Sequence, residues 1–396
     1  MSRIDDLVAE LCPDGVPRRE LGSFARRNGG TSITAARMKS LALVPGPVRV
    51  FGGGQTIADV AEGVVPSGDV VRTPSIIVKS RGNIGFVYYE KPFTHKSELW
   101  SYTVDTSFID QKFVYYYLLT QVDRLQGVAR ATSVKLPQLG VKDTDTLRIP
   151  VPPLEVQQEI VKILDQFTQL EAELEAELEA RRRQFAHYRD MLVSAANDAV
   201  WAPMGEVGEF FRGRRFTKSD VVEGGLASIH YGEIYTGYGT FADRPLSRVS
   251  PKLFPALRFA RKGDVVIAAV GETVEDVAKA VAWLGNEQVA IHDDTFAFRH
   301  SLNPKFVSYF FQTERFHSEK NRHVARAKVK RISGESLAKI SIPVPPRDEQ
   351  DRIVAILDDF DALVNDLSVG LPAELAARRK QYAYYRDRLL TFKEAA

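Results

Sequence analysis

The feature that most constrains this chain of 396 residues is an internal duplication. IPVPPLEVQQEIVKILDQF at 149–167 returns as IPVPPRDEQDRIVAILDDF at 342–360, an offset of 193 residues. RRRQFAHYRDML at 181–192 returns as RRKQYAYYRDRL at 378–389. A period of this length is too long for a solenoid repeat, so it predicts a duplicated domain followed by a duplicated helix.

The two copies match unevenly. The helical segments are closely similar, whereas the blocks before them share only short similar stretches, such as QKFVYYYLL at 111–119 and PKFVSYFFQ at 304–312. This contrast indicates that the helices keep one shared role while each block has a target of its own.

Each copied segment has the pattern of a long helix. In the first copy, apolar residues recur at steps of three and four from Ile160 to Leu192, which is the seam of a coiled coil. The tandem prolines at 152–153 suit a helix start, and the helix is expected from Leu154 to about Ala199. The second copy is expected to break near Gly370–Pro372, because proline interrupts a helix.

The blocks before the helices are rich in short β-branched and aromatic runs, such as SIIVKSRGNIGFVYY at 75–89, and each contains a short amphipathic helix. They are therefore expected to be mixed α+β domains. The predicted divisions are two such domains at 1–150, with a short N-terminal helix, and at 201–341, a central long helix at 151–200 and a C-terminal long helix at 342–396.

The charge alternates along the chain. Residues 13–150 hold 18 Lys and Arg against 12 Asp and Glu, and residues 201–341 hold 21 against 16, whereas residues 151–200 hold 5 against 10. Two basic blocks suggest a polyanionic partner. A single cysteine, Cys12, excludes an internal disulfide, and no apolar run is long enough to span a membrane, so a reduced cytoplasm is expected.

Catalytic motifs are missing from the sequence. There is no Gly-Lys-Ser/Thr phosphate loop and no Asn- or Asp-Pro-Pro-aromatic motif for methyl transfer. His292, Asp293 and Asp294 could suggest a metal site, but a solvated turn is favoured because no second ligand cluster has metal spacing. The chain is predicted to be neither an enzyme nor a metal protein.

Several motifs resemble the specificity subunits of type I restriction–modification systems. They are the PPxxxQ helix starts, PPLEVQ at 152–157 and PPRDEQ at 345–350, together with IVKSRGNIGFVYYEKPF at 77–93, LCPDGV at 11–16 and RRKQYAYYRDRLLTF at 378–392. The resemblance covers nearly the whole chain. It is weaker in the second block, where no clear counterpart of KSRGNIG is visible.

The resemblance implies an α+β fold with two target recognition domains separated by two long helices that form an antiparallel coiled coil. It implies that each domain reads one half of a bipartite, asymmetric site on double-stranded DNA. It further implies that the helices dock two methyltransferase subunits, and that nuclease/translocase subunits join the full complex. The chain itself would need no cofactor, since AdoMet, ATP and magnesium are expected on the partner subunits.

Two other functions remain open at this point. One is the recognition subunit of another multi-subunit restriction–methylation system. The other is a coiled-coil scaffold, which would explain the helices but not the basic, diverged blocks.

Basic and polar residues at loop edges are the candidates for DNA contact, because phosphates attract cations and base edges are read by polar side chains. In the first block these are Lys79, Arg81 and Asn83, and then Arg130, Thr132, Ser133 and Lys135. In the second block they are Arg212, Arg214, Arg215, Arg322, His323, Arg326, Lys328, Lys330 and Arg331.

Overall fold

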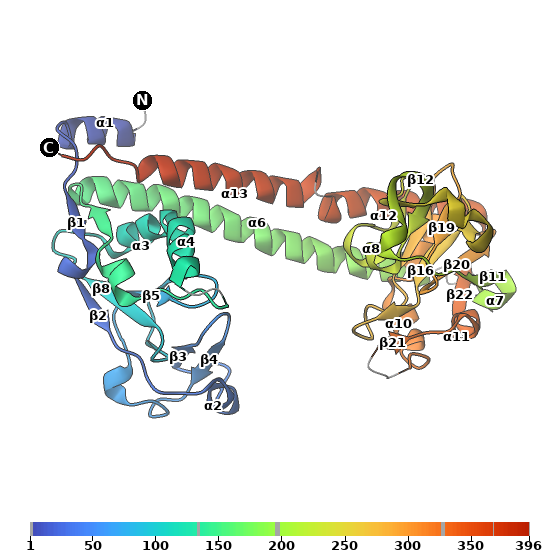
Figure 1. Ribbon diagram of the computed structural model, residues 1–396, viewed down its shortest axis with the longest axis horizontal. Coiled ribbons are helices and arrows are strands. Elements are labelled where there is room, and N and C mark those ends of the chain that lie inside the picture. The colour runs from blue at the N-terminus through green and yellow to red at the C-terminus, as the bar shows by residue number, and fades with distance from the viewer. Residues whose placement is uncertain (1–2, 133–134, 195–198, 326–328, 367, 396) are drawn as a thin grey trace. The chain divides into compact units, whose positions relative to one another are not determined.

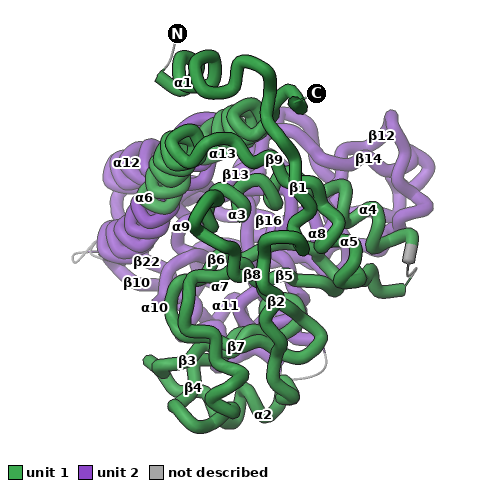
Figure 2. Tube along the Cα trace, turned by 90° about the vertical axis from the view of Figure 1, so that its left-hand side faces the viewer, with its two compact units in different colours: residues 1–174, 375–396 green, residues 175–374 purple. Residues whose placement is uncertain are grey.

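The computed structural model describes residues 3–132, 135–194, 199–325, 329–366 and 368–395 (Figure 1). The chain is a mixed α/β protein with one helix of 41 residues, α6 (Leu154–Ser194). Its internal contacts divide it into two compact units, Met1–Leu174 with Leu375–Ala396, and Glu175–Glu374 (Figure 2). None of the described helices has the length and apolar character needed to cross a membrane.

Unit 1 contains a four-stranded sheet in the order β2-β8-β5-β6, a three-stranded sheet β4-β3-β7, and the pair β1-β9. Its strands are β1 (Arg18–Glu20), β2 (Ala25–Asn28), β3 (Val48–Phe51), β4 (Ile57–Val60), β5 (Ser75–Lys79), β6 (Gly85–Tyr89), β7 (Phe93–His95), β8 (Trp100–Val104) and β9 (Arg148–Pro150). Its helices, besides the first half of α6 and most of α13 (Gly370–Leu389), are α1 (Arg3–Leu11), α2 (Ala35–Ser40), α3 (Gln111–Thr120), α4 (Val122–Thr132) and α5 (Val141–Asp145).

The main core of unit 1 joins the four-stranded sheet to the start of α6. Phe113 and Val114 of α3 are fully buried in one cluster with Ile160 and Leu164 of α6. Burying one such side chain contributes about 1.5–3 kcal/mol. The long helix is therefore anchored by its first three turns to the block that precedes it in the sequence.

Unit 2 contains a five-stranded sheet β11-β20-β16-β18-β13, a four-stranded sheet β14-β12-β19-β15, and the pairs β10-β22 and β17-β21. Its strands are β10 (Val200–Pro203), β11 (Gly208–Arg212), β12 (Val221–Ile229), β13 (Phe241–Ala242), β14 (Ser247–Val249), β15 (Phe259–Ala260), β16 (Val265–Ala268), β17 (Val270–Gly271), β18 (Ala280–Trp283), β19 (Val289–Ile291), β20 (Thr295–His300), β21 (Lys330–Arg331) and β22 (Ser341–Val344). Its helices are α7 (Met204–Val207), α8 (Tyr231–Thr236), α9 (Pro304–Phe310), α10 (Glu314–Lys320), α11 (Gly334–Lys339) and α12 (Arg347–Asn365).

The two units share one strand order. The order β2-β8-β5-β6 in unit 1 corresponds to β11-β20-β16-β18 in unit 2, and the antiparallel pair β1-β9 corresponds to β10-β22. In both, the last strand of the block carries the IP of the repeated IPVPP and leads into a long helix. The duplication inferred from the helices therefore extends to the diverged blocks.

The repeated glutamine of PPxxxQ fastens each helix to its block. Gln157 is fully buried, accepts the Asp110 N–H at 2.7 Å and donates to the Pro152 carbonyl at 2.6 Å. Gln350 accepts the Asn303 N–H at 2.6 Å and donates to the Pro345 carbonyl at 2.8 Å. Both therefore satisfy backbone groups that would otherwise be buried without a partner.

The aromatic residues of the copied helices pack within each unit. In unit 1, Phe167 of α6 stacks on Tyr385 of α13 (Gly370–Leu389) at 5.6 Å between ring centroids, and Glu171 pairs with Arg379 at 2.7 Å, so the two helices run in opposite directions. In unit 2, Phe185 of α6 stacks on Phe360 of α12 at 6.2 Å. Phe167 and Phe185 both belong to the apolar stripe of α6.

The ends of the copied helices differ from the expectation in detail. The helix expected to reach about Ala199 is described as far as Ser194, and residues 195–198 lie outside the described part. The second copy consists of two helices, α12 and α13, and Gly370 begins α13 with φ 78°. A left-handed backbone of this kind favours glycine.

Candidate nucleic-acid interface

In unit 1 the β5–β6 turn and the segment after α4 form one surface, although about fifty residues separate them. Arg81 of the turn forms an isolated antiparallel β-bridge with Gln138. The Gly82 N–H donates to the Pro137 carbonyl at 2.8 Å, and the Leu139 N–H donates to the Ser80 carbonyl at 2.8 Å. Arg81 therefore lies beside the backbone of residues 137–139, which follow Lys135 closely in the sequence.

A glutamine of α4 holds the shape of the β5–β6 turn. The Gln126 amide donates to the Gly82 carbonyl at 3.2 Å and accepts the Ile84 N–H at 2.9 Å. Gly82 has φ 77°, a conformation that other residues adopt only with strain. The backbone of the turn is thereby fixed at Gly82 and Ile84, while the side chains of Arg81 and Asn83 are exposed.

The side chains on this surface are mostly free to meet a ligand. Arg81, Asn83, Arg130 and Lys135 are exposed. Lys79 is half-buried and donates to the Gly54 carbonyl at 3.1 Å, which ties the turn to the β3–β4 hairpin. Thr132 ends α4, its side chain lies outside the described part of the structure, and so does Ser133.

The second block has a counterpart of this turn that its sequence does not reveal. The chain from β16 to β18, residues 269–279, occupies the same place in the strand order as the β5–β6 turn. Near its start lies β17, which pairs with β21 in an antiparallel direction. The antiparallel bridge between Arg81 and Gln138 is the corresponding contact in unit 1. The KSRGNIG sequence itself has no clear counterpart here, as expected, whereas the connection keeps its place in the strand order with other residues and a greater length.

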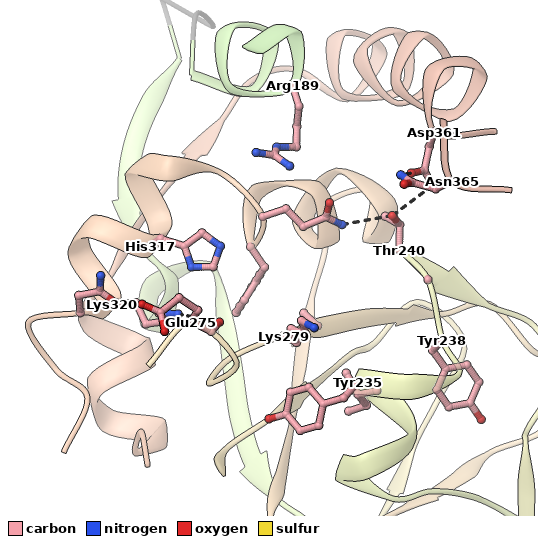
Figure 3. Close-up of a pocket in the computed structure, with 16 residues that line it drawn as sticks. Arg189, Tyr235, Tyr238, Thr240, Glu275, Lys279, His317, Lys320, Asp361 and Asn365 are labelled. Carbon is pink, nitrogen blue, oxygen red and sulfur yellow. Dashed lines mark hydrogen bonds between the residues drawn. The ribbon is translucent and has the colours of Figure 1, made fainter. Parts of the chain in front are cut away.

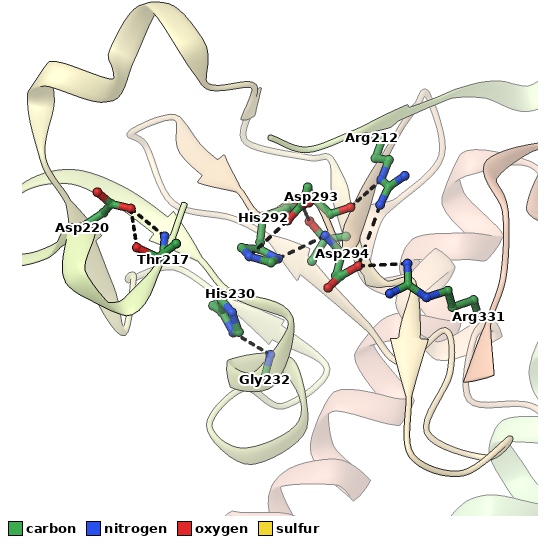
Figure 4. A network of polar contacts seen from close by, with 10 residues as sticks. Arg212, Thr217, Asp220, His230, Gly232, His292, Asp293, Asp294 and Arg331 are labelled. Atoms are coloured by element: carbon green, nitrogen blue, oxygen red, sulfur yellow. Dashed lines mark hydrogen bonds and ion pairs between the residues drawn. The ribbon is translucent and has the colours of Figure 1, made fainter. Parts of the chain in front are cut away.

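Two arginines near this second turn are oriented by one carboxylate. The guanidinium of Arg212 lies 3.8 Å from Asp294 and donates to the Asp293 carbonyl, and Arg331 of β21 lies 3.6 Å from Asp294 (Figure 4). Both arginine side chains are more than half exposed, so such pairs add little stability. Their effect is to direct two cations to a pocket of about 390 Å³, which His323 also lines.

The histidines beside this pocket belong to a packed polar cluster. His292 accepts the Asp294 N–H on Nδ1 at 3.1 Å, and its Nε2 lies 3.2 Å from Asp293. These three residues place potential metal-ligand atoms within 4.8 Å of one another. Protein groups already engage these atoms. Burial, and then the neighbouring His292, lowers the pKa of His230, whose ring lies 4.3 Å from that of His292.

The structure describes four of the remaining candidate residues of the second block. Arg214, Arg215 and Arg322 are exposed, and Lys330 pairs with Gly271 in the β17–β21 ribbon. Arg326 and Lys328 lie outside the described residues. Three residues with a structural role were not predicted from the sequence. Gln126 holds the β5–β6 turn, Asp294 orients two arginines, and Lys320 donates to carbonyls of the β16–β18 connection. Their roles depend on long-range partners that no local pattern encodes.

Comparison with known proteins identifies the family. The sequence profile described as the type I restriction modification DNA specificity domain matches residues 68–180 and 201–377, more than half of the chain. The chain belongs to this family of specificity proteins. The family expected from the sequence motifs is thus confirmed.

Individual specificity subunits agree with this assignment. A putative type I restriction enzyme specificity subunit of Haemophilus influenzae is 30% identical over 310 residues, which cover 72% of this chain and 73% of that protein. The EcoR124I/EcoR124II specificity subunit of Escherichia coli is 31% identical over 301 residues, covering 71% and 70%.

Solved structures share the fold of this specificity protein. The type I restriction–modification S subunit of M. genitalium has a TM-score of 0.50 at 17% identity, over 94% of this chain and 96% of that one. A chain from a study of complex assembly and conformational transition of the type I R-M system has a TM-score of 0.56 at 18% identity, over 96% and 98%.

Proposed function

We propose that this protein is the DNA-reading specificity subunit of a type I restriction–modification complex. Each of its two blocks is a target recognition domain that reads one half of a bipartite, asymmetric sequence in double-stranded DNA. The chain catalyses no reaction itself, works in the cytoplasm, and leaves AdoMet, ATP and magnesium to its partner subunits.

One observation carries this proposal. The two blocks keep the same strand order and place a turn at the same position, yet the turns differ in length and in every side chain that they expose. A shared frame with different exposed residues suits a protein that reads two different half-sites. Arg81, Asn83 and Lys135 in unit 1, and Arg212 and Arg331 in unit 2, would supply phosphate and base contacts.

The long helices are suited to bind protein subunits rather than DNA. Residues 151–200 carry twice as many acidic as basic residues, which would repel a DNA backbone. The opposite directions of α6 and α13 in unit 1, and the aromatic contacts in both units, support an antiparallel coiled coil. The exposed faces of these helices would dock two methyltransferase subunits, with nuclease/translocase subunits joining the larger complex.

Reconstitution tests the proposal. The purified chain alone, given AdoMet, ATP and magnesium, should neither methylate nor cut DNA. Together with its methyltransferase subunits, it should direct methylation to a split sequence. Methylation or cleavage by a preparation free of partner subunits would contradict the proposal, and so would a reconstituted complex that methylates without sequence preference.

A further inference from the structure

The β16–β18 connection of unit 2 is fixed by one buried cation. Lys320, the last residue of α10, has no exposed surface, and its ammonium donates to the carbonyls of Val274 at 2.9 Å, Glu275 at 3.3 Å and Val277 at 2.9 Å. An ammonium has three donors, so its hydrogen-bonding capacity is filled here. Burying a charge is costly unless it is satisfied in this way, and the three carbonyls must therefore keep one orientation.

The rest of the loop is fixed by its own residues. The Asp276 carboxylate accepts the Thr273 hydroxyl at 2.7 Å and the Thr273 N–H at 3.3 Å, and Ala278 has φ 66°. The hydroxyl of Tyr235 donates to the Val270 carbonyl at the start of the loop. Figure 3 shows Lys320, Glu275 and Tyr235 around the cavity of about 600 Å³ that lies beside the loop within unit 2.

We call the contacts of Lys320 with this loop, and those of Gln126 with the β5–β6 turn of unit 1, clamps. The two clamps occupy similar positions in their units but use different chemical groups. In unit 1, Gln126 of α4 holds the short β5–β6 turn; in unit 2, Lys320 of α10 holds the longer connection. Each clamp comes from the second helix after the sheet. Both turns are therefore rigid supports for the side chains that they expose.

The exposed residue that follows β17 is an acid. Glu272 comes directly after Gly271, which pairs with Lys330, and its side chain is exposed. An exposed carboxylate beside phosphates is repelled by them. The groups of a duplex that attract it are the exocyclic amino groups of bases in the major groove, and the N4 amino group of cytosine is the one that Glu and Asp typically bind.

We propose that Glu272 is a specificity-determining residue of unit 2 that accepts a hydrogen bond from a cytosine amino group, and that Lys320 is the positioning residue that holds its loop. The proposal rests on the DNA-reading function proposed above and names one contact within it.

The test uses the chain assembled with its methyltransferase subunits and a DNA library in which every position of the target is randomised. E272Q replaces one acceptor oxygen by a donor. It should lower discrimination at one base pair of the unit 2 half-site by about 10- to 100-fold and leave the other half-site unchanged. E206Q, an equal charge change at an exposed residue of α7, should preserve the wild-type sequence preference.

Lys320 is tested by K320M, which keeps the length of the side chain and removes its donors. Discrimination should fall at the same base pair although Glu272 is intact. If K320M does not assemble, D276N loosens the same loop through Thr273 and should give the same result. Unchanged discrimination in an assembled loop variant would overturn the positioning role.

The outcomes separate this proposal from the function on which it rests. A wild-type complex without sequence preference would refute the proposed function. A wild-type complex that reads a split site, with E272Q reading it equally well, would refute the base contact alone. Equally tighter binding of E272Q to all sequences would also refute the contact, because it would place Glu272 beside phosphates.

Discussion

The ammonium of Lys112 lies 2.9 Å from the carboxylate of Asp165, and 193 residues later Lys305 lies 2.7 Å from Asp358. The hydroxyls of Tyr116 and Tyr309 donate to the same two carboxylates, at 2.5 and 2.9 Å. Each set joins the first helix after a sheet to the long helix that follows. These duplicated residues therefore help to fix how each long helix leaves its block.

Replacing Gln157 by alanine should destabilise unit 1 by about 2–4 kcal/mol. The change leaves the Asp110 N–H and the Pro152 carbonyl without this buried partner, and each unsatisfied buried group costs about 1–3 kcal/mol. Urea unfolding measures the effect. Gln169→Ala, on an exposed face of the same helix, is the control and should change stability by less than about 0.5 kcal/mol. Equal losses in the two variants would contradict the role of Gln157.

Much of the long helices could be predicted from the sequence. Apolar residues at steps of three and four form a local pattern, and both copies of the repeat contain it. The PPxxxQ glutamine was visible as a motif, but its bonds to Asp110 and Asn303 were not, since these partners lie 47 residues away. The counterpart of the β5–β6 turn in unit 2 was hidden for a similar reason. Its identity depends on the strand order of unit 2, while the turn itself has changed in length and sequence.

The stability of unit 2 should fall as the pH falls from about 6.5 to about 4 because of His300. Burial lowers the pKa of this imidazole to about 4, while an unfolded histidine has a pKa near 6.5. Between these values the unfolded chain binds the proton and the folded chain does not, so stability is full above pH 6.5 and is lost toward pH 4.

The matched variants are H300Q and H187Q, the latter at an exposed position of α6. Between pH 7 and pH 5 the wild-type chain should lose about 2 kcal/mol more than H300Q. H187Q should lose as much as the wild type. Urea midpoints followed by tryptophan fluorescence provide the measurement, and an identical pH response of H300Q and the wild type would rule out this assignment.

Replacing Arg81 and Lys135 by alanine should weaken DNA binding by the assembled complex and make it less sensitive to salt. Each lost phosphate contact lowers the slope of log K against log salt by about one. Arg124→Ala with Lys91→Ala removes the same charges from exposed positions elsewhere in unit 1 and should leave the slope nearly unchanged. Equal slopes for the two double variants would show that the β5–β6 surface faces away from DNA.

The repeated LEAE sequence at 170–180 should act as a spacer, because it lies inside the helix α6, which separates the two blocks along the chain. One LEAE unit inserted after Glu177 adds about 6 Å and a net turn of about 40°. DNA turns by about 35° per base pair. The unread gap between half-sites should lengthen by one or two base pairs.

Two inserted units should lengthen the gap twice as much, with both half-sites unchanged in sequence. Mapping the methylated sites of each assembled variant gives the answer. A variant that methylates only at the original spacing would contradict the spacer role.

The central claim, that each block reads its own half of a split site, is tested most directly by exchanging residues 201–341 for the matching block of another family member. Methylated sites are mapped before and after the exchange, in complexes with the same methyltransferase. The account predicts a new sequence in one half-site, with the other half-site retained. A change in both half-sites, or in neither, would contradict it.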